Sequence, residues 1–518
     1  MNHIKITFYK DIRVQIFVLL VVLAGCSAKQ AETTQQKPNV LFIFADDQMF
    51  ESIGALEGCP VKTPNLDRLV DQGVLFSHAY NMGSFSAAVC VASRTMLNSG
   101  AFLWKAASYS PKANHRDKNS PGSTKGYHIE PQKPEGFWSQ FMKEAGYKTY
   151  MTGKWHVPGV NAAELFDTVM HVRPGMPNQT KERYARTFDP NEEDTWSPYD
   201  TSKGGFWKGG KHWSEIVGDN AITFIEDAKT TDDPFFAYVA FNAPHDPRQS
   251  PKKYVDMYPL EDIAVPESFL PEYPYNEYAG AGRTLRDEKL APFPRTEYSI
   301  QVNRQEYYAI ITHMDEQIGR ILNALEASGK ADNTYIFFTA DHGLAIGDHG
   351  FVGKQNMYES SMRVPLMVVG PKIPNQKVVD EFVYLQDVMA TALDLAGSEK
   401  AQQVDFNSLM PLATGQTKKS NYPTVYGAYF GSQRMYRTKD YKMIIYPTAN
   451  MVRLYDMKND PKEINDLAGD KEKHADLLKK LFEEYQQLQK QMNDPVDITE
   501  SFDNFMNGMP APSLAAMN

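Results

Sequence analysis

Cys90, Ser93 and Arg94 form a compact group of residues that could carry out chemistry. A thiol is a nucleophile, and the apolar segment 95–102 predicts that a helix begins close to Cys90. The unpaired N–H groups and the dipole at the start of a helix favour negative charge. A nearby arginine can bind an anion with both arms of its guanidinium. The pattern indicates attack on an anionic substrate, and a small buried structural cysteine is the plainer alternative.

Two pairs of residues far apart in the chain are candidates for a metal site. Asp46 and Asp47 follow one continuous apolar run, and Asp341 and His342 follow another. Hard divalent cations such as Ca²⁺ and Mg²⁺ prefer carboxylate oxygens, while the histidine leaves Zn²⁺ open. Each pair taken alone is explained as well by turn or cap residues.

Lysines and histidines at further places complete the candidate catalytic set. These residues are Lys154, His156, His245 and Lys354. Together with Arg94 they would form a pocket that binds an anion and moves protons. Taken one at a time, each lysine is better explained as a surface charge and each histidine as a structural residue.

The elements that must position these residues alternate between strand and helix. Apolar runs typical of buried strands are 39–45, 148–152, 235–241, 335–339 and 366–369. Helices are expected at 64–71, 137–145 and 304–328. This alternation predicts an α/β fold with a large, mainly parallel sheet flanked by helices. The candidate residues follow strand ends, and in such sheets that edge holds the ligand.

The pattern changes after residue 420. Short strands are expected at 425–430, 433–438, 441–446 and 452–456, and a helix at 474–492. We therefore expect a catalytic domain at 38–420 and a smaller C-terminal subdomain at 421–518, built from an antiparallel sheet and a helix. Loop-rich segments at 105–133, 173–210 and 248–297 are expected to shape access of a substrate.

The N-terminus predicts export. Basic residues precede the apolar run 14–23, which is too short to span a bilayer and is typical of a signal peptide. The following Leu23-Ala24-Gly25-Cys26 resembles a bacterial lipobox, which implies removal of residues 1–25 and membrane attachment through lipid on Cys26. Residues 26–37 would then be a tether. An ordinary secretory signal is the alternative. We expect an exported lipoprotein of the periplasm or the outer membrane.

Composition excludes several classes of protein. The chain has 64 acidic against 54 basic residues, a net charge of −10, which argues against nucleic acid as a partner. Aromatic residues make up 12% of the chain, as in globular proteins rather than disordered ones. Beyond the signal only Cys59 and Cys90 remain, too few for a disulfide scaffold, although one bridge between them stays open.

The motifs together resemble those of the formylglycine-dependent sulfatases of the alkaline phosphatase superfamily. Six of them have the order and rough spacing of that family: Asp46-Asp47-Gln48, Cys90 to Arg94, Gly153 to His156, Ala243-Pro244-His245, Asp341-His342-Gly343 and Gly353-Lys354. The resemblance covers about residues 39–467 and is greatest for the iduronate-sulfatase-like and polysaccharide branch. It implies an alkaline phosphatase-like fold.

The resemblance also implies a cofactor and a role for each residue. A maturation enzyme would oxidise Cys90 to formylglycine (3-oxoalanine), whose hydrate attacks the sulfur of a sulfate ester. One Ca²⁺ would be bound by Asp46, Asp47, the modified Cys90, Asp341 and His342. Arg94 and Lys154 would hold the hydrate and the sulfate, His156 the hydroxyls of the nucleophile, and His245 and Lys354 the sulfate and the leaving oxygen.

Three positions depart from the usual family pattern, one of them Asn98-Ser99-Gly100, where a Leu-Thr-Gly-like sequence is usual. Ala92 stands where proline is commoner, so that conversion of Cys90 depends on the maturation enzyme of the host. His342 stands where many members have asparagine, and histidine can still bind a metal through nitrogen.

The expected function is removal of sulfate from a sulfated carbohydrate, an oligosaccharide or polysaccharide. Aromatic-rich loops that could stack on sugar rings favour such a substrate. One alternative is a phosphate or phosphonate monoester hydrolase of the same superfamily. Another is a lipoprotein that binds sulfated glycans without turnover, with Cys90 unmodified.

Overall fold

The structure is a computed structural model that describes residues 36–114, 127–173, 186–187, 189–206 and 209–513. The expected signal peptide, Cys26 and nearly all of the expected tether lie outside these described residues. From Lys37 onward the chain forms one compact unit. The subdomain boundary after residue 420 stays a prediction.

A large sheet runs through this unit. In the described residues it has nine strands in the order β10-β2-β9-β7-β1-β6-β4-β5, with β8 paired to β2. Their bounds are β1 Asn39–Asp46, β2 Val74–Tyr80, β4 Lys148–Lys154, β5 Thr168–Arg173, β6 Phe235–Pro244, β7 Thr334–Ala340, β8 Arg363–Val364, β9 Leu366–Val369 and β10 Lys377–Tyr384. Only β8 and β9 run antiparallel to their neighbours in this part of the chain. The predicted mainly parallel α/β sheet is confirmed.

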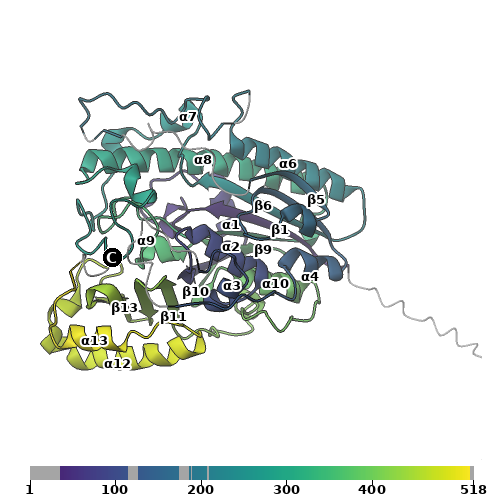
Figure 1. The fold of residues 1–518 in the computed structure, drawn as a ribbon. Coiled ribbons are helices and arrows are strands. Elements are labelled where there is room, and N and C mark those ends of the chain that lie inside the picture. Colours follow the sequence, from purple (N-terminus) through teal and green to yellow (C-terminus); the bar gives the residue numbers. More distant parts are fainter. Residues whose placement is uncertain (1–35, 115–126, 174–185, 188, 207–208, 514–518) are drawn as a thin grey trace, which may run out of the picture. The chain divides into compact units, whose positions relative to one another are not determined.

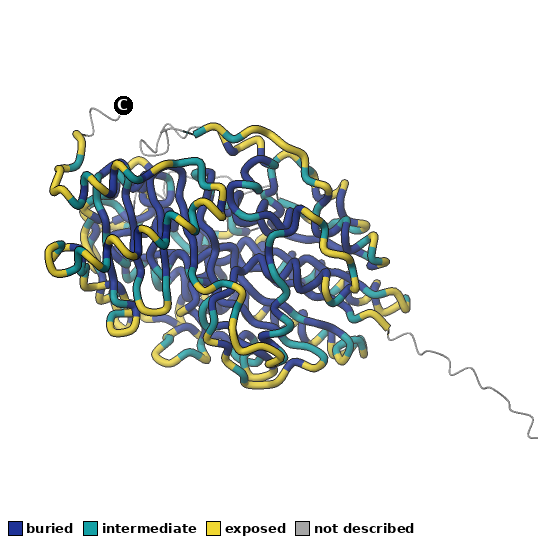
Figure 2. The backbone as a smooth tube through the Cα atoms, turned by 90° about the horizontal axis from the view of Figure 1, so that it is seen from below, coloured by how far each residue is buried: buried dark blue, intermediate teal, exposed yellow. Residues whose placement is uncertain are grey.

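Helices cover both faces of this sheet. Their bounds are α1 Pro64–Gln72, α2 Val89–Ser99, α3 Leu103–Ser108, α4 Trp138–Glu144, α5 Ala162–Leu165, α6 Trp213–Lys229, α7 Lys252–Val255, α8 Glu297–Ala327, α9 Glu359–Met362, α10 Asp387–Leu395 and α11 Met410–Ala413. The long α6 and α8 lie on one face, and α4 and α10 on the other (Figure 1). Every residue of β1 and β6 is therefore buried, as their continuous apolar sequences predict. Figure 2 shows this buried interior in dark blue.

One helix begins earlier than its apolar pattern indicates. The sequence predicts a start at Arg304, whereas α8 begins at Glu297. The hydroxyl of Thr296 accepts a hydrogen bond from the backbone N–H of Ser299, which caps the additional turns. None of the helices in the described part of the chain is long and apolar enough to cross a membrane.

A second, smaller sheet contains the predicted C-terminal strands. Its order in the described residues is β14-β13-β12-β11-β3, and the last four strands of the chain pair antiparallel. The bounds are β3 Gly83–Ser84, β11 Val425–Tyr429, β12 Gln433–Arg437, β13 Tyr441–Tyr446 and β14 Met451–Asp456, followed by helices α12 Lys471–Gln491 and α13 Thr499–Met506. The short β3 lies just before α2 in the sequence, so this sheet also supports the segment that leads to Cys90.

Candidate active site

Four neighbouring parallel strands deliver the candidate residues to one edge of the large sheet. These strands, in spatial order, are β7, β1, β6 and β4. Asp341 follows β7, Asp46 ends β1, His245 follows β6 and Lys154 ends β4. The sequence patterns thus predict both the strands and the edge at which their polar residues meet.

Cys90 is the second residue of α2, as the predicted helix start requires. Its Sγ lies 3.4 Å from His342 Nε2, 3.4 Å from Lys354 Nζ and 3.9 Å from Asp47 Oδ1. Burial, with the nearby Asp46 carboxylate, raises the pKa of the Cys90 thiol. Cys59 and Cys90 are both free, so no disulfide joins them.

The five residues expected to bind a metal lie together. Asp46, Asp47, Cys90, Asp341 and His342 are all buried, and one potential ligand atom from each lies within 4.8 Å of all the others. Burial and the neighbouring Asp341 raise the pKa of Asp46 to about 8. Carboxylates gathered in this way repel one another unless a cation lies between them.

Buried polar atoms that have no hydrogen-bond partner within the residues that the structure describes lie beside this cluster, and they indicate whether the site suits a bound cation. Among the described residues, neither amide atom of the fully buried Gln48 side chain has a hydrogen-bond partner, and Asp46 Oδ1 has none. Buried polar atoms without partners are costly, and a bound cation with its water ligands would pair them. Three carboxylates are the donor set of a hard divalent ion. The residues therefore fit such an ion.

The backbone at Asp47 adopts a left-handed conformation. Its φ is 72°, which costs a residue with a side chain about 1–2 kcal/mol. Two hydrogen bonds fix this conformation: the hydroxyl of Tyr307 donates to the carbonyl oxygen of Asp47 at 2.7 Å, and the N–H of Asp47 donates to Asp341 Oδ1 at 3.1 Å. Helix α8 thus supports the turn that presents the carboxylate of Asp47.

Two basic residues flank the carboxylates on one side. Arg94 Nε donates to Asp341 Oδ2 at 3.0 Å, and its NH1 donates to the backbone oxygen of Lys154 at 2.7 Å. The ammonium of Lys154 pairs with Asp46. Gly153 lets β4 reach this point, because its φ is 93° and a Cβ there would lie 1.8 Å from the carbonyl oxygen of Ala240.

Lys354 lies on the nucleophile side of the site. Its ammonium is 2.8 Å and 2.7 Å from the two carboxylate oxygens of Asp47, in addition to its contact with Cys90. Asp287 Oδ2 is 3.9 Å away. This lysine is held between the carboxylate and the sulfur.

His245 is oriented by the residue that follows it. Its Nδ1 lies 2.6 Å from Asp246 Oδ1 and 2.8 Å from the Asp246 carbonyl oxygen, so Nδ1 carries a proton. Its Nε2 faces the site, 3.7 Å from Asp47 Oδ2. The sequence identifies His245 as a candidate but assigns no role to Asp246. Whether an adjacent carboxylate can hydrogen-bond to the imidazole depends on the direction of its side chain, which the sequence does not give.

His156 follows β4 with a φ of 53°. In the described part of the chain its Nδ1 has no hydrogen-bond partner. Burial, together with the cations Lys154 and Arg94, lowers the pKa of His156 to about 2. The imidazole is therefore neutral and can accept a proton, the more readily once an anion is bound beside it.

These side chains border a pocket of about 650 Å³. Its lining residues are Ala87, Ala88, Cys90, His156, His245, Leu285, Arg286, Asp287, Lys354 and Gln355. The sequence does not single out Arg286 or Asp287. They belong to the loop-rich segment 248–297, which is expected to shape access but contains no motif that marks these two positions.

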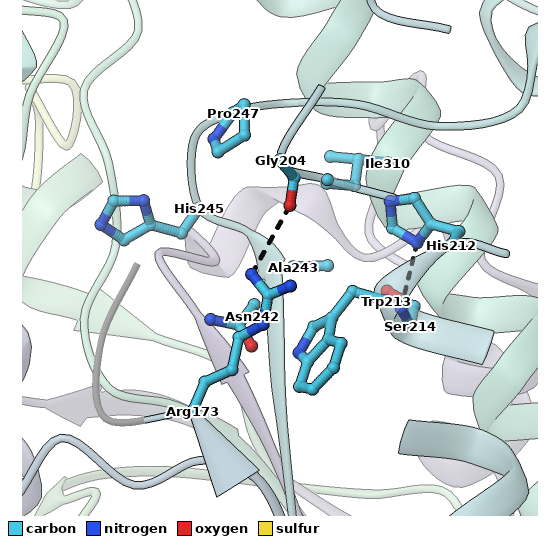
Figure 3. Close-up of a pocket in the computed structure, with 11 residues that line it drawn as sticks. Arg173, Gly204, His212, Trp213, Ser214, Asn242, Ala243, His245, Pro247 and Ile310 are labelled. Carbon is cyan, nitrogen blue, oxygen red and sulfur yellow. Dashed lines mark hydrogen bonds between the residues drawn. The ribbon is translucent and has the colours of Figure 1, made fainter. Parts of the chain in front are cut away.

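A smaller cavity of about 280 Å³ adjoins the other side of the loop that carries His245. Figure 3 shows the guanidinium of Arg173 and the indole of Trp213 in this cavity, with the imidazole of His245 pointing away from both. Arg173 packs over the indole ring at 4.0 Å. The imidazole therefore serves the larger pocket.

Comparisons with known proteins agree with this arrangement. The family model described as Sulfatase matches residues 38–398, and one described as N-sulphoglucosamine sulphohydrolase, C-terminal, matches residues 347–491. The curated N-acetylglucosamine-6-O-sulfatase of Bacteroides thetaiotaomicron is 26% identical over 91% of this chain and 89% of its own length.

Solved structures share the fold. A protein solved in complex with its substrate, D-glucosamine-2-N,6-O-disulfate, has a TM-score of 0.66 at 23% identity and covers 90% of this chain and 100% of its own. A phosphonate monoester hydrolase of Silicibacter pomeroyi has a TM-score of 0.69 at 20% identity and covers 88% of this chain and 96% of its own. At these identities the likeness establishes the fold, which is confirmed as alkaline phosphatase-like.

Proposed function

Because this chain belongs to the sulfatase family, we propose that it removes sulfate from a sulfated carbohydrate, using a formylglycine made from Cys90 and a bound Ca²⁺. One observation carries the proposal. The potential ligand atoms of Asp46, Asp47, Cys90, Asp341 and His342 lie within 4.8 Å of one another, and Cys90 also lines a pocket that contains basic side chains.

A formylglycine at position 90 and a bound Ca²⁺ would supply the nucleophile and part of the charge. When present, Ca²⁺ polarises the sulfate oxygens as a Lewis acid, and a formylglycine hydrate offers one hydroxyl for attack and a second that allows sulfate to leave. Asp46, Asp47 and Asp341 would hold the cation, with His342 beside them. Everything else in the reaction falls to side chains of the chain itself.

Three basic residues are placed to bind the sulfate. Arg94, Lys154 and Lys354 are held by the carboxylates at fixed positions around Cys90. Cations that are already in position need no reorganisation as negative charge spreads in the transition state. The orienting carboxylates thus also make the pocket complementary to the reacting anion.

His245 is the residue we assign to the leaving oxygen. Its Nδ1 proton is held by Asp246, and a carboxylate in that position favours the imidazolium that can donate a proton from Nε2. Lys354 is held against Asp47 and Cys90 instead. The neutral His156, which lines the same pocket, is the residue we assign to accepting a proton from the nucleophile.

The first experiment is mass spectrometry of the tryptic peptide from Leu69 to Arg94, prepared from the native host, together with sulfate release from a panel of sulfated sugars. We expect the mass of formylglycine or its hydrate at Cys90, and turnover that is lost in Cys90→Ala. An unmodified thiol in protein that binds the sugars would favour a non-catalytic glycan-binding protein. Faster cleavage of 4-nitrophenyl phenylphosphonate than of 4-nitrophenyl sulfate would favour a phosphonate hydrolase.

We also propose that the protein is an exported lipoprotein anchored through Cys26, in the periplasm or at the outer membrane. The apolar run 14–23 and the lipobox-like Leu23 to Cys26 support this proposal. Labelled palmitate should enter the wild-type protein and not Cys26→Ser, which should be recovered in the soluble fraction. Label in both proteins would contradict attachment at Cys26.

A further inference from the structure

We propose that Arg286 binds a second anionic group, a carboxylate or another sulfate, on the sugar that carries the scissile sulfate. This inference rests on the proposed function and narrows its substrate class. It arises from the position of one partly exposed cation in the pocket, from the carboxylates that hold it, and from its contact with His245.

Arg286 is the basic side chain that a ligand in this pocket can reach. Among the described lining residues Lys354 is also basic, but its side chain is only 1% exposed and is held by Asp47. The side chain of Arg286 is 37% exposed. A substrate whose sulfate lies at Cys90 would therefore meet the guanidinium of Arg286 with another part of its structure.

Two buried carboxylates hold the guanidinium in place. Arg286 Nε donates to Asp287 Oδ1 at 2.6 Å, and Arg286 NH2 lies 3.7 Å from Asp246 Oδ1. Both carboxylate side chains are only 4% exposed. Asp287 is itself fixed, because Gln355 Nε2 donates to its Oδ2 at 2.8 Å. The folded protein has thus already ordered a long side chain, so that binding of a ligand need not be weakened by the loss of its rotamer freedom.

The difference in exposure selects an anion rather than a cation. In the pairs of Arg286 with Asp287 and Asp246, the side chain of the positive partner is the accessible one, and those of the negative partners are buried. Guanidinium has five donors in a planar arrangement that matches the oxygens of a carboxylate or a sulfate. A fixed, partly desolvated guanidinium is therefore a better match for an anion than for a sugar hydroxyl.

The contact between Arg286 and His245 indicates which part of the substrate carries the second anionic group. Arg286 NH2 donates to His245 Nε2 at 3.2 Å, because a guanidinium has only donors. The ring is therefore neutral in this contact, and Nε2, the atom assigned to the leaving oxygen, must release the guanidinium before it can carry a proton. An anion bound at Arg286 would therefore be on the leaving sugar, close to the carbon that bears the leaving oxygen. The alternative role of this contact is to orient His245 alone, and that role would affect all sugar sulfates equally.

The test compares two matched pairs of sugars as competitive inhibitors of 4-nitrophenyl sulfate hydrolysis by the matured enzyme. Competition measures binding whether or not a sugar is cleaved. Glucosamine-2-N,6-O-disulfate is compared with N-acetylglucosamine 6-sulfate, and glucuronate 2-sulfate with glucose 2-sulfate. The members of the first pair differ by a second sulfate, and those of the second pair differ by a carboxylate. The pair whose doubly anionic member binds more tightly therefore identifies the group that Arg286 binds. The variants are Arg286→Gln and Arg286→Lys, with Arg283→Gln as control.

Arg283 is a suitable control because it lies in the same segment, pairs with Glu272 and does not line the pocket. We expect the wild-type enzyme and Arg283→Gln to bind the doubly anionic member of at least one pair more tightly. In Arg286→Gln the ratio of the inhibition constants of the neutral and the doubly anionic sugar should fall about 10- to 100-fold, which corresponds to the loss of a hydrogen bond to a charged group. Arg286→Lys should retain part of it, and binding of the neutral sugar sulfates should change less than about twofold.

Three results would overturn the inference. The wild-type enzyme could bind both members of each pair equally. Arg286→Gln could weaken the neutral and the doubly anionic sugars to the same extent, which would make Arg286 a positioning residue for His245. Arg286→Gln could also leave the preference intact. Failure of the proposed function would be recognised separately, because the matured wild-type enzyme would then not hydrolyse 4-nitrophenyl sulfate at all. That result would also overturn the inference about Arg286.

Discussion

The hydroxyl of Tyr307 lies 2.7 Å from the carbonyl oxygen of Asp47 and accepts a hydrogen bond from the N–H of Met49 at 2.9 Å. One side chain from α8 thus bridges the two peptide groups on either side of Gln48, the residue that follows Asp47, whose φ is 72°. The carboxylate of Asp47 is therefore positioned by a residue that has no acidic, basic or metal-binding character. This relationship leads to the first prediction.

Tyr307→Phe should weaken metal binding as well as the fold. The change leaves the buried carbonyl of Asp47 and the N–H of Met49 without their partner, which costs about 1–3 kcal/mol for each group that stays unpaired. We expect calorimetry to show at least a tenfold loss of Ca²⁺ affinity. Tyr308→Phe is the control, because the neighbouring Tyr308 hydroxyl accepts a hydrogen bond from Arg304 instead. Equal Ca²⁺ affinity in both variants would contradict the role of Tyr307.

Asp246→Asn should reveal the proton donor through its dependence on the leaving group. The amide keeps the shape of the side chain but removes the charge that favours a protonated His245. We expect kcat/KM for a sugar sulfate to fall about 100-fold, the lower range for general acid catalysis. Hydrolysis of 4-nitrophenyl sulfate should change little, because nitrophenolate leaves without a proton. An equal loss on both substrates would show that Asp246 acts on something other than the leaving oxygen.

The sequence predicts most of the strands, because buried parallel strands are continuous apolar runs. The strand β9 has the predicted bounds 366–369. The sequence does not predict β10, which lies at the edge of the sheet and contains the charged residues Asp380 and Glu381. An edge strand needs less apolar sequence, so its pattern is weaker. A strand of this kind becomes visible only through its pairing with β2.

The same contrast holds for the site. Cys90, Lys154 and the metal-binding candidates are predictable because their residue types imply chemistry and because they follow recognisable elements. Tyr307, Asp246 and Arg286 are not predictable in this way. Their roles depend on hydrogen bonds to residues brought near by folding, and a tyrosine in a helix or an arginine in a loop has no distinctive sequence pattern.

Removal of the metal should destabilise the protein as well as inactivate it. Without the metal ion, the buried carboxylates of Asp46, Asp47 and Asp341 keep their basic partners but still repel one another, and burial together with Asp341 raises the pKa of Asp46. A ligand at about 100 times its Kd stabilises the folded state by about 2.7 kcal/mol. We therefore expect EDTA to lower Tm by several degrees and added Ca²⁺ to restore it. EDTA saturated with Ca²⁺ is the control, and a Tm that does not respond to chelation would argue against a bound ion.

Gly153→Ala should be far more damaging than Gly146→Ala, although both glycines have positive φ values, 93° and 86°. A Cβ at position 146 would meet nothing within 4 Å. Gly146→Ala should therefore lose only about 1–2 kcal/mol in folding free energy, from backbone strain. A Cβ at position 153 would lie 1.8 Å from the carbonyl oxygen of Ala240, and β4 must move away from β6 to accommodate it. That movement displaces Lys154, the next residue, from Asp46. Urea denaturation should show a loss of more than about 4 kcal/mol for Gly153→Ala, and any folded fraction should bind sulfate weakly. Equal losses of stability in the two variants would show that the close approach of β4 to β6 is not what requires glycine at this position.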